Sequence, residues 1–260
     1  MFDLTQTLKL LPAFALVLTR LGGIMLAAPV YSSLAVPARV KIGLTALVAL
    51  MIFPVLPWDA ATVPATLAGA VIGMAGELLV GLAIGLAVNL LFTGLQLAAQ
   101  MMAQQMGLGL ARVYDPTVQG ETGILAQFYL LIGLAVLLTF NGHQLVIRGV
   151  LDSFKALPPM AVVLRPEVLE ILRGLLAGSY VLALKVAVPT VIVLFLVSVM
   201  MGFLGRTVPQ INILVVGFPL RVGVGLLAMI VSFGAAMLVF SEGYGRTVDA
   251  VGEMIRHLGG

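Results

Sequence analysis

The chain has 260 residues, of which 61% are hydrophobic and 10% are charged, with a formal net charge of +3 at pH 7. Because a soluble domain carries about 25% charged residues, this composition indicates an integral membrane protein and excludes an ordinary soluble domain. The small net charge, without a basic cluster, gives no basis for nucleic-acid binding. The absence of cysteine excludes disulfides, a thiol nucleophile and cysteine-bound metals.

The first apolar segment, Leu8–Ala28, has Lys9 at its start and a single charge in its interior, Arg20. The residues before it lack a basic region and a small-residue cleavage site, so we expect the segment to stay in the mature protein. A charge inside an apolar helix needs a partner, an interface or water. A second apolar helix is predicted over Ile42–Leu56, and Pro57 and Trp58 follow it at an expected membrane interface.

A third helical pattern runs from Pro64 to Gln105 without a strong stop signal. At a rise of 1.5 Å per residue such a helix is ~63 Å long, about twice the thickness of the hydrocarbon core. We therefore expect it to break, to tilt strongly or to leave the lipid. The Gly81-xxx-Gly85 spacing in this segment is typical of helices that pack closely together.

The end of this pattern combines glutamines with methionines and then loosens at two glycines. Amides that faced lipid would leave hydrogen bonds unmade, so this end is predicted to face protein or a water-filled passage. Methionine is unbranched and adaptable, which suits a surface that seals and reshapes. The candidate residues are Met101, Met102, Gln104, Gln105, Met106, Gly107, Leu108, Gly109 and Leu110.

The second half of the chain continues with apolar segments and short charged stretches. In order, these are an apolar segment at Thr122–Ile147, a short amphipathic helix at Arg165–Arg173, an apolar segment at Leu175–Gly205, an irregular link at Val208–Leu220, an apolar segment at Val222–Phe240 and an amphipathic surface helix in the tail, 248–258. With six spans, basic residues are shared almost evenly between the two sides and set no orientation. Either six spans is wrong, or partners fix the placement.

An enzymatic site finds no support in the sequence. His143 and His257 do not form a metal-binding spacing, and no nucleophile or phosphate-binding motif is present. We expect no catalytic residue, cofactor or metal. Three charges lie in apolar segments, Arg20, Glu77 and Lys185, and such charges are functional by default. For Glu77 and Lys185 we favour an ion pair, either with each other or between subunits.

A specific string lies near the C-terminus, Val208-Pro-Gln-Ile-Asn-Ile-Leu-Val-Val-Gly-Phe-Pro-Leu-Arg221. It resembles the FliR family of flagellar export proteins. Three further strings agree in order and spacing: Gly76-Glu-Leu-Leu-Val-Gly81, the stretch from Gln105 to Pro116, and Asn141-Gly-His143 followed by Ser153-Phe154. The resemblance covers essentially the whole chain. The related subunit of virulence injectisomes, SctT, shares the Pro-Gln-x-Asn core and is the alternative.

The resemblance implies an all-α, membrane-associated fold of helical hairpins. A FliP-like part would cover residues 1–160, and a FliQ-like hairpin with the amphipathic tail would cover 161–260. The chain would assemble with FliP, FliQ and FlhB homologues into a helical export gate for unfolded flagellar subunits. This gate would contact membrane lipid in the bacterial inner membrane, at the flagellar basal body.

The resemblance also implies that the loop at Met106–Gly120, with the Gln/Met helix end before it, contributes to a plug that closes the pore, and Gly107 and Gly109 are expected to free its backbone to move. The break between the last two helices is predicted from its own residues: two prolines remove backbone donors, and the amides of Gln210 and Asn212 can bond the freed carbonyls. We expect this break to contact neighbouring subunits near the cytoplasmic entrance, with an ordinary hairpin connection as the alternative. The residues of the break are Pro209, Gln210, Asn212, Gly217, Phe218 and Pro219. A small-solute transporter and a passive membrane scaffold are the competing functions; a transporter would usually show matching repeats, which this sequence lacks.

Overall fold

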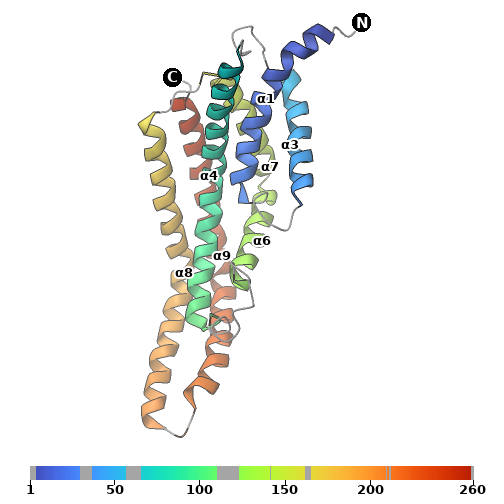
Figure 1. The fold of residues 1–260 in the computed structure, drawn as a ribbon. Helices are drawn as coiled ribbons and strands as arrows, with labels where there is room; N and C mark the ends of the chain where they lie inside the picture. Colours follow the sequence, from blue (N-terminus) through green and yellow to red (C-terminus); the bar gives the residue numbers. More distant parts are fainter. Residues whose placement is uncertain are drawn as a thin grey trace. The chain divides into compact units, whose positions relative to one another are not determined.

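The computed structural model of the chain is a helical protein, shown in Figure 1. It describes residues 4–29, 37–56, 66–109, 123–140, 142–161, 165–208, 210 and 212–258. Within these ranges the elements are α1 (Leu4–Ala27), α3 (Ala38–Ile52), the 3-10 turn η1 (Phe53–Val55), α4 (Leu67–Met106), α6 (Ile124–Thr139), α7 (Gly142–Ala156), α8 (Pro166–Thr207) and α9 (Ile213–Leu258). The expected all-α class is confirmed.

Four helices in the described part of the chain are long and apolar enough to cross a membrane. They are α3 with its following turn (Ala38–Val55), α4, α8 and α9. The apolar stretches of α1 and α6 are shorter. The chain is thus a membrane protein of the all-α class, with fewer full-length spans among its described residues than the six apolar segments predicted.

The α4 helix runs without interruption for 40 residues. This agrees closely with the predicted pattern from Pro64 to Gln105 and excludes a break within it. A straight helix of that length measures ~60 Å, about twice the hydrocarbon thickness. Two of the three expectations stay open for α4: a strong tilt, or an exit from the lipid.

Two of the predicted boundaries are wrong, because α8 and α9 are longer than expected. The amphipathic helix predicted at Arg165–Arg173 forms the first turns of α8, which continues to Thr207. The tail helix is the last part of α9, which begins at Ile213. The irregular link predicted over Val208–Leu220 is therefore only a short connection. A change from charged to apolar composition does not stop a helix unless a breaking residue accompanies it.

The chain divides into two compact units by its internal contacts. The first unit comprises Met1–Leu90, Asn141–Leu176 and Arg246–Gly260, and the second comprises Leu91–Phe140 and Ala177–Gly245. Both units therefore contain parts of α4, α8 and α9. The boundary predicted near residue 160 concerned likeness to FliP and FliQ rather than contacts, and it stays a prediction.

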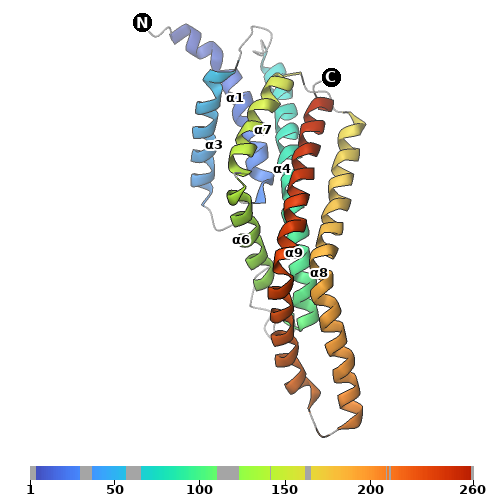
Figure 2. The ribbon, with the colours of Figure 1, turned by 180° about the vertical axis from the view of Figure 1, so that it is seen from behind.

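In the first unit α1 lies between α3 and α4, as Figures 1 and 2 show. A Cβ at Gly81 would lie 2.1 Å from the carbonyl oxygen of Arg20, and one at Gly85 would lie 2.7 Å from that of Ile24. The backbones of α1 and α4 therefore touch, and the close packing predicted from Gly81-xxx-Gly85 is confirmed. Apolar side chains from α3, α7 and the ends of α8 and α9 complete this core.

In the second unit the later part of α8 and the earlier part of α9 form a hairpin (Figure 2), against which α4 and α6 pack. A Cβ at Gly94 of α4 would lie 2.6 Å from the carbonyl oxygen of Ser179 of α8. Phe92 of α4 meets Phe240 of α9 edge-on, with ring centroids 5.6 Å apart. The side chain of Leu95 contacts Gly133 of α6. These contacts between α4 and its neighbours are apolar and depend on shape.

Candidate functional site

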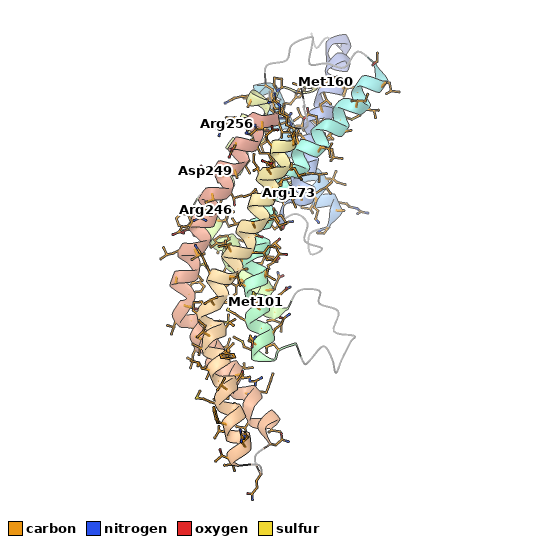
Figure 3. The ribbon with its side chains drawn as sticks, turned by 90° about the vertical axis from the view of Figure 1, so that its left-hand side faces the viewer. Met101, Met160, Arg173, Arg246, Asp249 and Arg256 are labelled. Atoms are coloured by element: carbon orange, nitrogen blue, oxygen red, sulfur yellow. The ribbon has the colours of Figure 1, made fainter. Side chains whose placement is uncertain are left out.

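The Gln/Met end of α4 has one buried face and one polar face. Met102 and Met106 are fully buried, whereas Gln104 and Gln105 are exposed. Met101 is half-buried and is labelled on α4 in Figure 3. The separation follows helical periodicity, because buried positions recur every three or four residues. The helix therefore presents its glutamines away from the apolar core of the second unit.

A Schellman motif ends α4. The Gly107 N–H donates to the carbonyl of Gln104 at 3.0 Å, and the Leu108 N–H donates to that of Ala103 at 3.1 Å. Gly107 has φ 81°, a left-handed conformation that glycine adopts without strain. Gly107 thus gives the helix a defined end, and the backbone freedom predicted at Gly107 and Gly109 stays a prediction. Leu110 and the rest of the predicted plug lie outside the described residues.

The connection between α8 and α9 is organised by Asn212. Its side-chain oxygen Oδ1 accepts a hydrogen bond from the N–H of Val215 at 3.4 Å. Asn212 is therefore the N-cap of α9. The predicted hydrogen bond from its amide nitrogen to a freed carbonyl stays a prediction. Gln210 is exposed, and Pro209 lies outside the described residues.

Three residues assigned to this break lie within the helix instead. Gly217, Phe218 and Pro219 belong to the second turn of α9, with Gly217 buried and Phe218 exposed. Pro219 removes a backbone donor inside the helix and thereby leaves the carbonyl of Val215 without its helical partner. The break is therefore narrower than predicted, and Pro219 acts on α9 itself.

A buried ion pair joins α1 to α4 in the first unit. Arg20 donates through Nε to Oε2 of Glu77, and both side chains are fully buried. The other guanidinium nitrogens donate to backbone carbonyls, Nη1 to Ser153 and Nη2 to Leu157, each at 3.0 Å. The guanidinium carbon also lies 4.1 Å from the centre of the Phe154 ring. The pair thus fixes α1, α4 and the end of α7 to one another.

The second carboxylate oxygen of Glu77 holds the turn after α7. Oε1 accepts a hydrogen bond from the N–H of Met160 at 3.2 Å. Met160 has φ 71°, which is uncommon for a residue other than glycine. The side chain of Met160, labelled in Figure 3, packs on Gly73 of α4. Glu77 is thus satisfied at both oxygens, which makes the alternative of an ion pair with Lys185 wrong.

Lys185 lies on α8 and is exposed. Its neighbours on the same side of the helix, Leu184 and Val188, are exposed apolar residues. Among the residues that the structure describes, none forms an ion pair with Lys185. The second part of the favoured interpretation, an ion pair between subunits, therefore stays a prediction.

Charged side chains gather where α8 begins and α9 ends. Figure 3 shows Arg246, Asp249 and Arg256 along the end of α9 and Arg173 near the start of α8. Asp249, Glu253 and Arg256 are exposed, whereas Ile255 and Leu258 are buried in the core of the first unit. The amphipathic pattern of the tail is confirmed. No cluster of metal-binding side chains occurs in the described ranges.

Three residues in these contacts were missed by the sequence reasoning. Ser153 and Leu157 accept hydrogen bonds from Arg20 through backbone carbonyls, for which a sequence carries no signal, and the Ser153 hydroxyl is a further acceptor at 3.4 Å. Gly225 receives the side chain of Met106. Its signal is present, since Gly225 is a glycine inside an apolar helical pattern, a position that often marks close packing.

Comparisons with known proteins agree over most of the chain. The family model described as "Bacterial export proteins, family 1" matches residues 11–247. The flagellar biosynthetic protein FliR of Escherichia coli strain K12 is 30% identical, over 91% of this chain and 92% of the relative. The FliR of Pectobacterium carotovorum is 32% identical over 81% and 80%, and that of Bacillus subtilis strain 168 is 26% identical over 98% and 99%.

Proposed function

Because the chain belongs to the FliR family of bacterial export proteins, we propose that it is a core subunit of the flagellar protein export gate. The relatives are flagellar biosynthetic proteins, and four of its described helices are long and apolar enough to cross a membrane. The chain is thus a membrane component of the flagellar export apparatus. The proposal of a core gate subunit is carried by one observation: the similarity to FliR proteins covers nearly the whole chain rather than one motif.

We place the chain in the bacterial inner membrane, assembled with FliP, FliQ and FlhB homologues around a channel for unfolded flagellar subunits. Support comes from the surface of the hairpin in the second unit. Large apolar side chains are exposed on both α8 and α9, among them Phe195, Phe203, Leu227, Ile230 and Val231. Large apolar side chains exposed on membrane-length helices are covered by partner subunits or lipid.

The exposed charge of Lys185 supports contact with partner subunits rather than with lipid alone. A charge on an exposed apolar helix face is expensive in lipid and requires a counter-charge or water. We propose that Lys185 pairs with a carboxylate of a partner subunit. The role is structural and specific to assembly rather than enzymatic.

The plug is the second part of the proposal. The polar face of α4 ends at Gln104 and Gln105, and these amides are exposed within the chain. We propose that this end and the segment at 106–120 close the passage at rest. A fixed loop that packs against neighbouring subunits is the alternative. Gln210 and Asn212, at the connection before α9, are proposed to contact those neighbours near the cytoplasmic entrance.

Complementation tests the proposal. The chain, expressed in a flagellated bacterium that lacks its own FliR, is expected to restore secretion of hook and filament subunits and to copurify with FliP and FliQ. A chain that reaches the membrane but neither copurifies with them nor restores secretion would refute the gate function. Restored injectisome secretion alone would favour the SctT-like alternative, and solute uptake by the isolated chain would favour a transporter.

A further inference from the structure

The side chain of Met106 occupies a notch in α9. Met106 is the last residue of α4 and is fully buried. A Cβ built on Gly225 would lie 2.5 Å from its Cε, 2.8 Å from its Cγ and 3.1 Å from its Sδ. Carbon atoms that are not bonded prefer about 3.5–4.0 Å. The thioether therefore fills the space that any other residue at position 225 would need.

This contact coincides with the end of an ordered element. The Schellman motif closes α4 at Gly107, immediately after Met106. Leu108 is half-buried, and Gly109 is exposed. Met106 is thus the last fully buried side chain in the described range 66–109. The position from which the following segment departs is set by where Met106 is held.

The contact is also of a kind that can be broken and remade. Methionine has an unbranched side chain that adapts to irregular gaps. Its withdrawal from the notch leaves no buried donor or acceptor unsatisfied, unlike the withdrawal of a hydrogen-bonded group. The notch itself requires no rearrangement of a side chain at position 225, because that residue has none.

We propose that Met106 and Gly225 form a latch: the latch holds the end of α4 against α9 in the closed gate and opens during export. Met106 is a positioning residue for the segment that follows it. The opening of the latch rests on the proposed function, whereas the holding of α4 by Met106 rests on the geometry alone.

The opening is tested by a reversible crosslink, since the chain contains no cysteine. The double variant Met106→Cys/Gly225→Cys brings two thiols together, because Sγ of a cysteine at 106 takes the place of Met106 Cγ, which lies 2.8 Å from the Cβ position at 225, within reach of a bond to Sγ at 225. Oxidation of the assembled complex is expected to stop subunit export, and a reductant is expected to restore it. Normal export with the crosslink formed would overturn the latch.

A second crosslink in the same hairpin is the matched control. Thr190 of α8 and Ser232 of α9 have hydroxyl oxygens 3.4 Å apart, so Thr190→Cys/Ser232→Cys joins α8 to α9 without involving α4. We expect export to continue when this control pair is oxidised. If the control pair forms its disulfide and the Met106/Gly225 pair does not, the two latch positions are not adjacent and the inference fails.

A labelling experiment that does not depend on export tests whether Met106 holds the end of α4. A reporter, Leu108→Cys, is labelled by a thiol reagent in the assembled complex. Gly225→Val fills the notch with a branched side chain that the flexible thioether cannot share, and is expected to raise the labelling rate by about tenfold, as an overpacked contact shifts an equilibrium. Gly223→Val, two residues away with nothing within 4 Å of its Cβ position, is expected to leave the labelling rate unchanged. Equal labelling in both variants would overturn the latch.

Complementation, crosslinking and labelling together distinguish a failure of the gate function from a failure of the latch. If the unaltered chain restores no export in the deletion strain, the gate function fails and the labelling experiment alone judges the contact. If the chain restores export and the oxidised latch does not impede it, the gate function stands and the latch fails.

Discussion

The two units of the molecule fasten α4 by opposite means. In the first unit, Glu77 of α4 is buried against Arg20 and the N–H of Met160 in a network of directional hydrogen bonds. In the second unit, Met106 at the end of the same helix meets Gly225 through apolar contact alone. Hydrogen bonds weaken steeply as their angles open, whereas a flexible thioether tolerates displacement. The helix α4 thus has a fixed junction, where Glu77 binds Arg20 and Met160, and an adaptable junction, where Met106 packs on Gly225.

The difference matters because a buried polar network has no partly broken state of low energy. Withdrawal of Arg20 would leave the Glu77 carboxylate and the carbonyls of Ser153 and Leu157 without their partner in the core, at a cost of about 3–5 kcal/mol, which is a large part of a domain's stability. We therefore expect the end of α4 at Met106, rather than the contact at Glu77, to move during export.

Glu77→Leu breaks the fixed junction and is expected to have the largest effect. It leaves Arg20 as a buried charge without its partner, which costs about 3–5 kcal/mol. The double variant Arg20→Met/Glu77→Leu is expected to recover much of this, since no charge stays buried. The measurement is the thermal midpoint of the purified complex. Glu253→Ala, at an exposed carboxylate, is the control; equal losses in both variants would contradict a buried pair.

Gly81→Ala attacks the same junction through shape. Its Cβ would meet the carbonyl oxygen of Arg20 at 2.1 Å, so α1 and α4 must separate, at a cost of about 1–3 kcal/mol. Gly22→Ala is the control, because nothing lies within 4 Å of its Cβ position. Chemical denaturation of the complex compares the two. If Gly81→Ala were as stable as Gly22→Ala, the backbones of α1 and α4 would not be in contact.

Asn212→Ala is expected to have a smaller effect. It removes the N-cap of α9, which is worth about 1 kcal/mol. Gln210→Ala, at an exposed side chain before the cap, is expected to leave stability unchanged. Both variants are scored for thermal stability and for secretion. Normal assembly and secretion in both would refute the proposed contact of this connection with neighbouring subunits.

Substitutions of Lys185 are expected to leave the stability of the chain itself almost unaltered, because its side chain is exposed. Their effect falls on assembly. Lys185→Glu is expected to lower the yield of copurified partner subunits, while Lys185→Arg keeps the charge and retains them. Quantitative copurification is the measurement. Unchanged yield with Lys185→Glu would show that no partner carboxylate faces this position.

The sequence predicted the helical class and the extent of α4, because an apolar pattern with no internal proline and a single charge, Glu77, leaves few alternatives. It misplaced the ends of α8 and α9 for an identifiable reason. The predicted segments ending at Arg173 and beginning at Leu175 are separated by Gly174 alone, yet one glycine in a helix costs only about 1 kcal/mol. Gly243, in α9, packs against Leu182 and Leu91 rather than ending a helix.

The sites were predicted less completely. Sequence showed that Arg20 and Glu77 each need a partner, but they are 57 residues apart, and Lys185 was an equally good candidate for Glu77. Which charges meet depends on how helices pack. Gly107 was recognised as a special position, but its role as a helix terminator depends on hydrogen bonds to Ala103 and Gln104 that only the backbone geometry reveals.

Hydrogen exchange in the assembled gate tests the contrast between the two junctions most directly. Amide protection is compared between the idle complex and one that holds a stalled export substrate. The account predicts that exchange at 103–109 rises in the engaged complex, while exchange at 16–24 and 150–157, around the Arg20 network, does not change. Equal rises at both junctions, or no change at the end of α4, would contradict it.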